Sequence, residues 1–149
     1  MSEPVRAHAP NCVGCGPENT FGIGLELSGD ADRLSGELTL HPHHEGSPGI
    51  AHGGTIATVL DDACGRFMYL TGEPAVTSRI EVDFLRPVRI GTRLTVEVEI
   101  EARDEQGIDV TGELRDADGR PLARCRARMV FVNPDHFVRH GQPAGAQSV

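Results

Sequence analysis

Apolar and polar residues alternate over most of the second half of the chain, the period of β-strands that bury one face. Four such runs follow one another after residue 75, and the segments between them are short and rich in Gly, Pro and Asp. Parallel neighbours need a crossover of about a dozen residues, so these short connections predict antiparallel pairing. The predicted strands, including an earlier one of the same period, are 33–40, 76–84, 94–102, 108–114 and 122–132.

One segment has a helical period instead. From about Thr55 to Leu70 the apolar residues recur every three or four positions, and Gly72 and Pro74 end the run. This helix is the only predicted element that can cover the apolar face of the sheet. The sequence therefore predicts an α+β domain with a curved antiparallel sheet around one long helix. The open edges of such a sheet favour dimerisation.

The ends of the chain lack this regularity. Residues 1–32 are rich in Gly, Pro and Asn and are expected to form an irregular arm, ahead of a domain over 33–132. Residues 133–149 are expected to be a flexible tail.

Composition narrows the classes of function. The 149 residues carry a net charge of −8, and the 14 basic side chains are all Arg. The negative charge disfavours nucleic-acid binding, and the missing lysine excludes Schiff-base chemistry and a P-loop. No apolar run reaches the ~20 residues of a membrane span, and the N-terminus has no signal-peptide pattern. A cytoplasmic protein is expected, so its four cysteines are expected to be thiols or partly a metal pair.

Two adjacent aspartates on the predicted helix are expected to differ in their surroundings. At about 100° per residue, Asp62 falls on a polar stripe with Arg66, in the favourable order for an exposed ion pair. Asp61 falls with Ala57 and Met68 on a small, mostly apolar strip beside the core face. Taken alone, Asp61 is most simply a partly exposed carboxylate that water or an amide satisfies. In a lined cleft it would be a candidate general base.

The approach to the helix adds possible donors. His52, Gly53 and Gly54 lead into the helix, where backbone amides lack helical partners and the dipole is positive. Such an end can hold an anion or a developing oxyanion, and glycine lets a carbonyl approach closely. With a carboxylate about two turns further on, this is a plausible acyl-transfer site.

These residues resemble the hotdog-fold acyl-CoA thioesterases of the phenylacetate-type group, over about residues 11–132. The run from His52 to Asp61 is similar to the family's His-Gly-Gly motif, with the catalytic acid nine residues after the His. Other segments that resemble the family are Pro48–Ala51, Asp83–Pro87 with Gly91, and Cys12–Gly16 with Asn19 and Gly22.

The resemblance implies a thioesterase that acts on an acyl-CoA without a metal or organic cofactor. It also implies a homodimer or homotetramer with active sites at the subunit interface. Asp61 would be the general base or nucleophile, and the Gly54 amide would polarise the thioester carbonyl. His52 would hold the entrance loop or contact the thioester, and Thr77 of a partner subunit would help to hold water. The expected substrate contacts are Gly53, Ala57, Met68, Arg86 and Arg89.

Two features leave the function open. The cluster Arg86, Arg89 and Arg93 could capture the phosphates of coenzyme A, or could simply balance the glutamates of the next strand. Gly46 stands where some family members have an Asn, six residues before the His, so an amide donor is missing. A non-catalytic acyl-CoA sensor and an acyl-thioester hydratase or dehydratase therefore remain alternatives.

Cys12 and Cys15 have the spacing of metal ligands. The histidines that could complete such a site are His8, His41, His43 and His44. A structural zinc site needs four ligands, and the chain has no second Cys-x-x-Cys. We therefore expect the two cysteines to pack as small apolar side chains in a Gly-rich turn, and no metal site.

Overall fold

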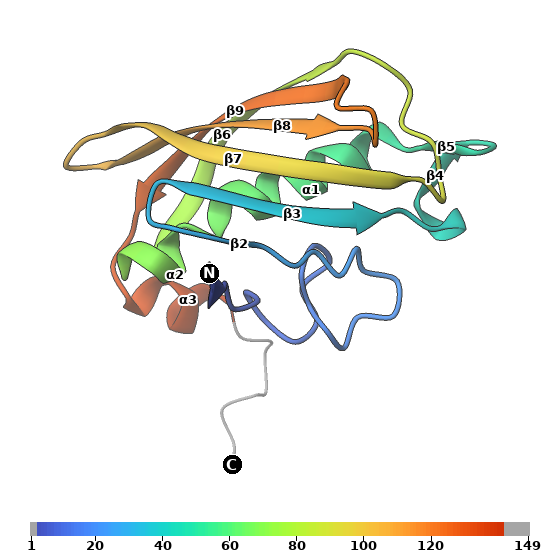
Figure 1. Cartoon of the computed structure of the whole chain (residues 1–149). Coiled ribbons are helices and arrows are strands. Elements are labelled where there is room, and N and C mark those ends of the chain that lie inside the picture. The colour runs from blue at the N-terminus through green and yellow to red at the C-terminus, as the bar shows by residue number, and fades with distance from the viewer. Residues whose placement is uncertain (1–2, 142–149) are drawn as a thin grey trace.

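The computed structural model describes residues 3–141, in which an antiparallel sheet of seven strands curves over one helix (Figure 1). The strand order is β1-β2-β3-β7-β8-β9-β6. The five long strands are β3 (Arg33–Thr39), β6 (Ala75–Phe84), β7 (Arg93–Arg103), β8 (Gly107–Arg115) and β9 (Pro121–Phe131). The predicted α+β architecture is confirmed, and all five strands lie close to their predicted positions.

Four shorter strands have no counterpart in the prediction. β1 (Glu3–Pro4) and β2 (Ser28–Gly29) extend the sheet beside β3. β4 (Glu45–Ser47) and β5 (Ile50–Ala51) pair with each other after the 3-10 turn η1 (Pro42–His44). Strands of two or three residues are too short to show a period of two, so the pattern could not reveal them.

The predicted helix is interrupted. α1 (Gly53–Gly65) begins two residues earlier than expected, and α2 (Met68–Thr71) follows after a break at Arg66 and Phe67. The amide of Arg66 bonds to the carbonyl of Ala63, three residues back, so the last turn of α1 tightens. The apolar period runs through this break because both residues keep right-handed helical dihedrals. Gly72, at φ 72°, ends α2 as predicted.

A third helix, α3 (Asp135–His140), forms within the segment expected to be a tail. The remainder of that predicted tail, residues 142–149, lies outside the described residues. No helix within residues 3–141 has the length and apolar character needed to cross a membrane.

The core lies between α1 and the concave face of the sheet. The predicted core face of the helix is buried, except for Leu70, which is 38% exposed at the end of α2. The buried side chains of that face are Ile56, Val59, Leu60, Ala63 and Phe67. They pack in one cluster with inward-facing strand residues such as Leu34, Val96 and Leu114. The helix thus covers one face of the sheet, as the pattern predicted.

Residues 3–27, which we call the N-terminal segment, cover the other side of α1. Val5, Leu25 and Leu27 are buried in the same core cluster, and Arg66 is buried beneath this segment. The guanidinium of Arg66 donates to the carbonyl oxygens of Val5 (2.7 Å) and Leu25 (3.2 Å), and to Asp62 Oδ2 (3.1 Å). The expectation of an exposed Asp62–Arg66 pair is therefore wrong, because residues beyond the helix exclude water from it.

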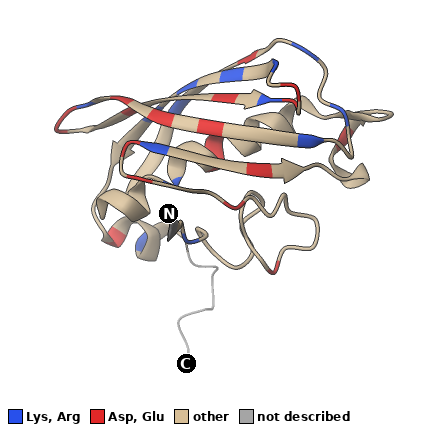
Figure 2. Ribbon diagram, viewed as in Figure 1, with Lys and Arg blue, Asp and Glu red and all other residues tan. Residues whose placement is uncertain are grey.

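Charged residues recur along the long strands of the sheet (Figure 2), where they alternate with buried residues that face α1. They therefore lie on the outer face of the sheet. Arginines of β9 pair with acidic residues of β8 and of the turn before it: Arg124 with Glu113 of β8, and Arg128 with Asp109 of β8 and with Asp104 of the turn. Exposed pairs of this kind contribute little to stability. The charged face therefore matters mainly for keeping this side of the sheet hydrated.

We expect Arg66→Met to lower the free energy of unfolding by about 3–5 kcal/mol, because it leaves the Asp62 carboxylate buried without its cation. It also leaves two carbonyl oxygens without their donor. Urea unfolding measures the loss. Arg33→Met, which removes an exposed pair with Glu99, is the matched control and should cost less than about 1 kcal/mol. Equal losses in the two variants would contradict a structural role for the buried pair.

Candidate active site

Asp61 and Thr77 lie in contact. The hydroxyl of Thr77, on β6, donates to Asp61 Oδ1 on α1 over 2.7 Å. Asp61 is half-buried, and Thr77 is exposed at the open edge of the sheet. The resemblance implied that Thr77 comes from a partner subunit, but in the structure this contact forms within one chain. The hydroxyl fixes one oxygen of the carboxylate.

The pair opens into a cleft of about 720 Å³. The cleft lies between α1, β6 and the N-terminal segment, and its walls are largely apolar. Met68, Val76, Met129 and Phe137 are among the lining side chains. Of the two substrate contacts predicted on the helix, Met68 lines this cleft and Ala57 does not. An acidic group beside an apolar cleft suits the hydrolysis of a ligand with an apolar portion.

The entrance of α1 is capped by its own histidine. Nδ1 of His52 accepts a hydrogen bond from the amide of Gly54 over 2.9 Å, which makes His52 the N-cap. Such a cap holds the entrance loop, one of the two roles expected of His52. The Gly54 amide is exposed but has a partner, so the imidazole must turn aside or share this donor when a carbonyl binds. A β-carbon on Gly53 would lie 3.5 Å from the Phe84 ring.

Gly46 lies against this entrance. A β-carbon on Gly46 would be 3.0 Å from the Cα of His52 and 3.4 Å from its ring. A side chain at this position would therefore touch His52, which explains how an Asn there could act at the entrance. In this chain position 46 has no side chain, and among residues 3–141 the only side chain that bonds to the Gly54 amide is His52.

Arg86 and Arg89 lie apart from the Asp61 cleft. They line a second hollow of about 590 Å³, together with Ile50 beside the entrance of α1. Arg86 donates to the carbonyl of Pro121 over 2.6 Å, and Ile50 pairs with Arg89 as an isolated β-bridge. The structure thus groups these arginines with the helix entrance and not with the acid.

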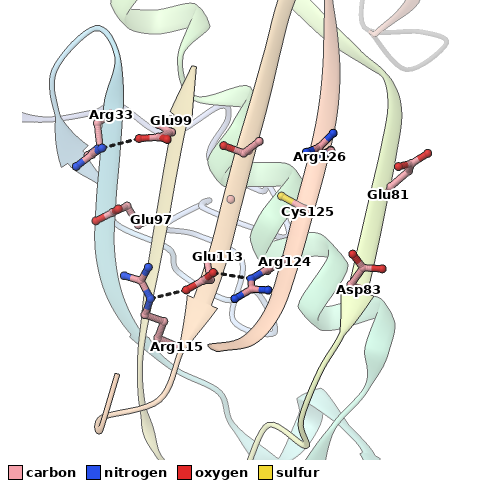
Figure 3. Close-up of a pocket in the computed structure, with 12 residues that line it drawn as sticks. Arg33, Glu81, Asp83, Glu97, Glu99, Glu113, Arg115, Arg124, Cys125 and Arg126 are labelled. Atoms are coloured by element: carbon pink, nitrogen blue, oxygen red, sulfur yellow. Dashed lines mark hydrogen bonds and ion pairs between the residues drawn. The ribbon is translucent and has the colours of Figure 1, made fainter. Parts of the chain in front are cut away.

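A third hollow lies on the outer face of the sheet, away from α1 (Figure 3). Figure 3 shows Glu113 between Arg115 and Arg124, with Arg33 against Glu99. The lining of this hollow carries five carboxylates and four guanidinium groups. Most of these guanidinium groups already form ion pairs with glutamates of the lining. An anionic coenzyme would meet net negative charge there, so this hollow is a poor site for it.

The N-terminal segment brings a polar cluster to the wall of the Asp61 cleft. His8 Nδ1 lies 3.0 Å from Asp62 Oδ1, and the thiol of Cys12 lies 3.3 Å from the same oxygen. Burial raises the pKa of the neighbouring Cys15 thiol to about 12. Burial also tends to raise the pKa of Asp62, but the hydrogen bond from His8 and nearby positive charge outweigh it and hold that pKa below its ordinary value.

Sequence spacing could not find this cluster, because Asp62 lies 50 residues from Cys12. In the sequence, His8 is one of four histidines that could complete a metal site with Cys12 and Cys15, and spacing does not distinguish it from the others. The other three, His41, His43 and His44, pack against one another around the η1 turn. His44 is buried there next to the carbonyl of Phe21, and burial lowers its pKa.

Comparisons with known proteins agree with this arrangement. Residues 48–123 match the family model of the thioesterase superfamily, a stretch that includes the helix entrance, Asp61 and Thr77. Acyl-coenzyme A thioesterase THEM5 of Mus musculus is 31% identical over 65 residues, which are 44% of this chain and 26% of that protein. Acyl-coenzyme A thioesterase THEM4 of Xenopus laevis is 31% identical over 92 residues, which are 61% of this chain and 40% of that protein.

The match therefore spans less than half the length of these two curated relatives. Among solved structures, the thioesterase superfamily protein RHA08564 is 29% identical with a TM-score of 0.70, over 79% of this chain and 58% of that chain. The curved sheet around α1 is the hotdog fold. With the family model matching more than half of the residues, the chain belongs to the thioesterase superfamily.

Proposed function

We propose that the protein hydrolyses the thioester of an acyl-CoA, with Asp61 as the catalytic acidic residue. The observation that carries the proposal is the Asp61 carboxylate, held by Thr77 beside a largely apolar cleft. Membership of the thioesterase superfamily and the names of the curated relatives support this reaction and this substrate class. The cleft would take the acyl chain.

In this reaction the carboxylate of Asp61 takes a proton from water while the water oxygen attacks the thioester carbonyl carbon. The carbon–sulfur bond then breaks, and the coenzyme A thiolate leaves and regains a proton. In the nucleophilic alternative, Asp61 attacks the carbonyl itself and water hydrolyses the resulting anhydride. In both cases Thr77 orients the carboxylate, because its hydroxyl occupies Oδ1 and leaves Oδ2 for the reacting water or carbon.

A complete site needs a second copy of the chain. Gly54 and Asp61 are seven residues apart on α1, about 10 Å along the helix axis. A single carbonyl spans only about 6 Å between the donor that holds its oxygen and the group that attacks its carbon. We infer that the Gly54 amide of one chain serves the Asp61 of its partner, so that the protein acts as a homodimer or a larger homo-oligomer.

The free edge of the sheet favours this pairing. β6 is a ten-residue edge strand, and Phe84 at its end is 56% exposed. An uncovered edge of this length is a template for pairing with another chain. Antiparallel pairing of two β6 strands would bring Thr77, near the start of one strand, beside the end of the other. That end carries Phe84, which lies against Gly53 at the helix entrance.

From the same pairing of β6 strands we also propose a binding site for coenzyme A. Arg86 and Arg89 follow directly after β6 and line the hollow beside the helix entrance. In the dimer they would lie near the partner's Asp61 cleft, so the phosphates would bind to one chain and the acyl group to the other. Guanidinium groups suit phosphates because they donate two parallel hydrogen bonds.

We expect Asp61→Asn to lower kcat by about 100-fold or more while binding of an acyl-CoA persists, because the amide cannot accept the proton. Thiol release from a panel of short, medium, long and aromatic acyl-CoAs measures kcat, and calorimetry measures binding. The exposed Asp32→Asn is the control and should keep parental kcat. Asp62 is unsuitable as a silent control because it is buried with Arg66 and His8. Binding by the parent protein without any thiol release would favour a non-catalytic module.

We expect Thr77→Val to lower kcat/KM by about 10- to 100-fold, because it removes a hydrogen bond to a charged group. Thr77→Ser keeps the hydroxyl and should retain most of the activity. Steady-state hydrolysis of the best acyl-CoA of the panel measures both variants. If Thr77→Val and Thr77→Ser are equally active, the hydroxyl does not orient Asp61.

We expect Gly54→Pro to lower kcat by about 100- to 1000-fold, because it removes the proposed oxyanion donor. Proline is tolerated in the first helical turn, so circular dichroism of the variant should show the parental fold. Mixed dimers of Gly54→Pro and Asp61→Asn chains contain one intact site only if the two groups act across the interface. Refolding the two inactive variants together should therefore restore activity, and no recovery in a proven mixed dimer would overturn the shared site.

A further inference from the structure

We propose that His8, Cys12, Cys15 and Asp62 form a structural zinc site that fastens the N-terminal segment to α1. The four side chains come from two parts of the chain, and their donor atoms all lie within 4.8 Å of one another. The donors are one imidazole nitrogen, two sulfurs and one carboxylate oxygen. This is a set that zinc accepts, and thiolates disfavour magnesium and calcium.

The spacing of the donors fits a tetrahedron. Zinc bonds of about 2.0–2.3 Å place tetrahedral ligands about 3.3–3.8 Å apart. His8 Nδ1 lies 3.2 Å from Cys15 Sγ, 4.0 Å from Cys12 Sγ and 3.0 Å from Asp62 Oδ1. Cys12 Sγ lies 3.3 Å from the same carboxylate oxygen. The other two donor pairs, Cys12 with Cys15 and Cys15 with Asp62, are at most 4.8 Å apart. All four donors are thus close enough to share one zinc ion after small shifts.

There is no room for a side chain at Gly14, between the two cysteines, or at Gly16, directly after Cys15. A β-carbon on Gly14 would lie 2.4 Å from Asp62 Cγ, and one on Gly16 would lie 2.3 Å from the backbone nitrogen of Cys12. Glycine at position 14 therefore lets the carboxylate of α1 reach the cysteine loop. The amide of His8 also points to Cys15 Sγ over 3.2 Å, as amides do toward metal-bound thiolates.

Arg66 orients the carboxylate of Asp62 from the side away from the proposed metal. Asp62 Oδ1 faces the sulfurs and His8, while Oδ2 accepts from Arg66 over 3.1 Å. Arg66 is itself fixed by the carbonyls of Val5 and Leu25. With zinc bound, the charges of two thiolates and one carboxylate are balanced by the metal and the guanidinium, which suits a buried site.

Four protein ligands leave zinc no open position, so this site would be structural and not catalytic. It lies in the wall of the Asp61 cleft, and its helical ligand is the residue next to Asp61. The zinc would hold the turn of α1 that carries the acid and keep the wall closed. Metal binding does not depend on the proposed thioesterase activity, so either hypothesis can fail without the other.

The test is the zinc content of the full chain after reconstitution with zinc and gel filtration. We expect one zinc per chain in the parent protein and none in the double variant Cys12→Ala/Cys15→Ala. Cys64→Ala removes a buried thiol outside the cluster and should keep the metal. Chelation should lower the Tm of the parent and leave that of the double variant unchanged.

Cobalt alone, added to the apoprotein, gives a second readout that does not require a variant to fold. Tetrahedral coordination with two thiolates should produce intense visible bands and thiolate-to-cobalt charge transfer. Asp62→Asn should shift these bands, because one charged oxygen ligand is lost. The proposal is overturned if the reconstituted parent holds no more zinc than the double cysteine variant, or if its cobalt spectrum lacks thiolate charge transfer.

Discussion

The buried guanidinium of Arg66 joins the two parts of the chain on which the rest of the structure depends. It crosses from α1 to the carbonyls of Val5 and Leu25, and it pairs with Asp62. The apolar residues of the N-terminal segment then complete the core on the side of the helix that the sheet leaves open. A buried cation requires acceptors of this kind, since an unpaired one is costly, and within the described residues only the Nε of this guanidinium lacks a partner. The N-terminal segment is therefore part of the packed domain.

The adjacent aspartates of α1 are divided by this packing. Asp62 is covered by the N-terminal segment and is held by His8 and Arg66, whereas Asp61 is turned toward β6 and its cleft. One residue along a helix is a rotation of about 100°, which is enough to place one carboxylate in a structural cluster and the other beside a ligand cavity. The proposed catalytic residue Asp61 is thus held in place by its neighbour Asp62, whose own contacts are structural.

The open edge at β6 is the other feature that shapes the proposed function. The helix entrance and Asp61 lie too far apart for one carbonyl, and both lie close to β6 at its opposite ends. Pairing of two such edges would satisfy the unpaired backbone groups and complete the site in one step. In the proposed dimer, the arginines after β6 would lie beside the partner's cleft, where they could bind the phosphates of the proposed substrate.

The apolar pattern of the sequence was enough to predict the five long strands, their antiparallel pairing and the helix that covers them, because period two and period 3.6 record which residues face the core. The helix pattern also singled out His52, Gly54 and Asp61, and the family resemblance added Thr77; the structure places Thr77 against Asp61 and His52 against Gly54. Only the tertiary structure decided that Asp62 and Arg66 are buried and that His8 joins Cys12 and Cys15. It also separated Arg86 and Arg89 from the acid. The burial of Asp62 and Arg66 depends on contacts between residues 41 to 61 positions apart, and local periodicity carries no information about such contacts.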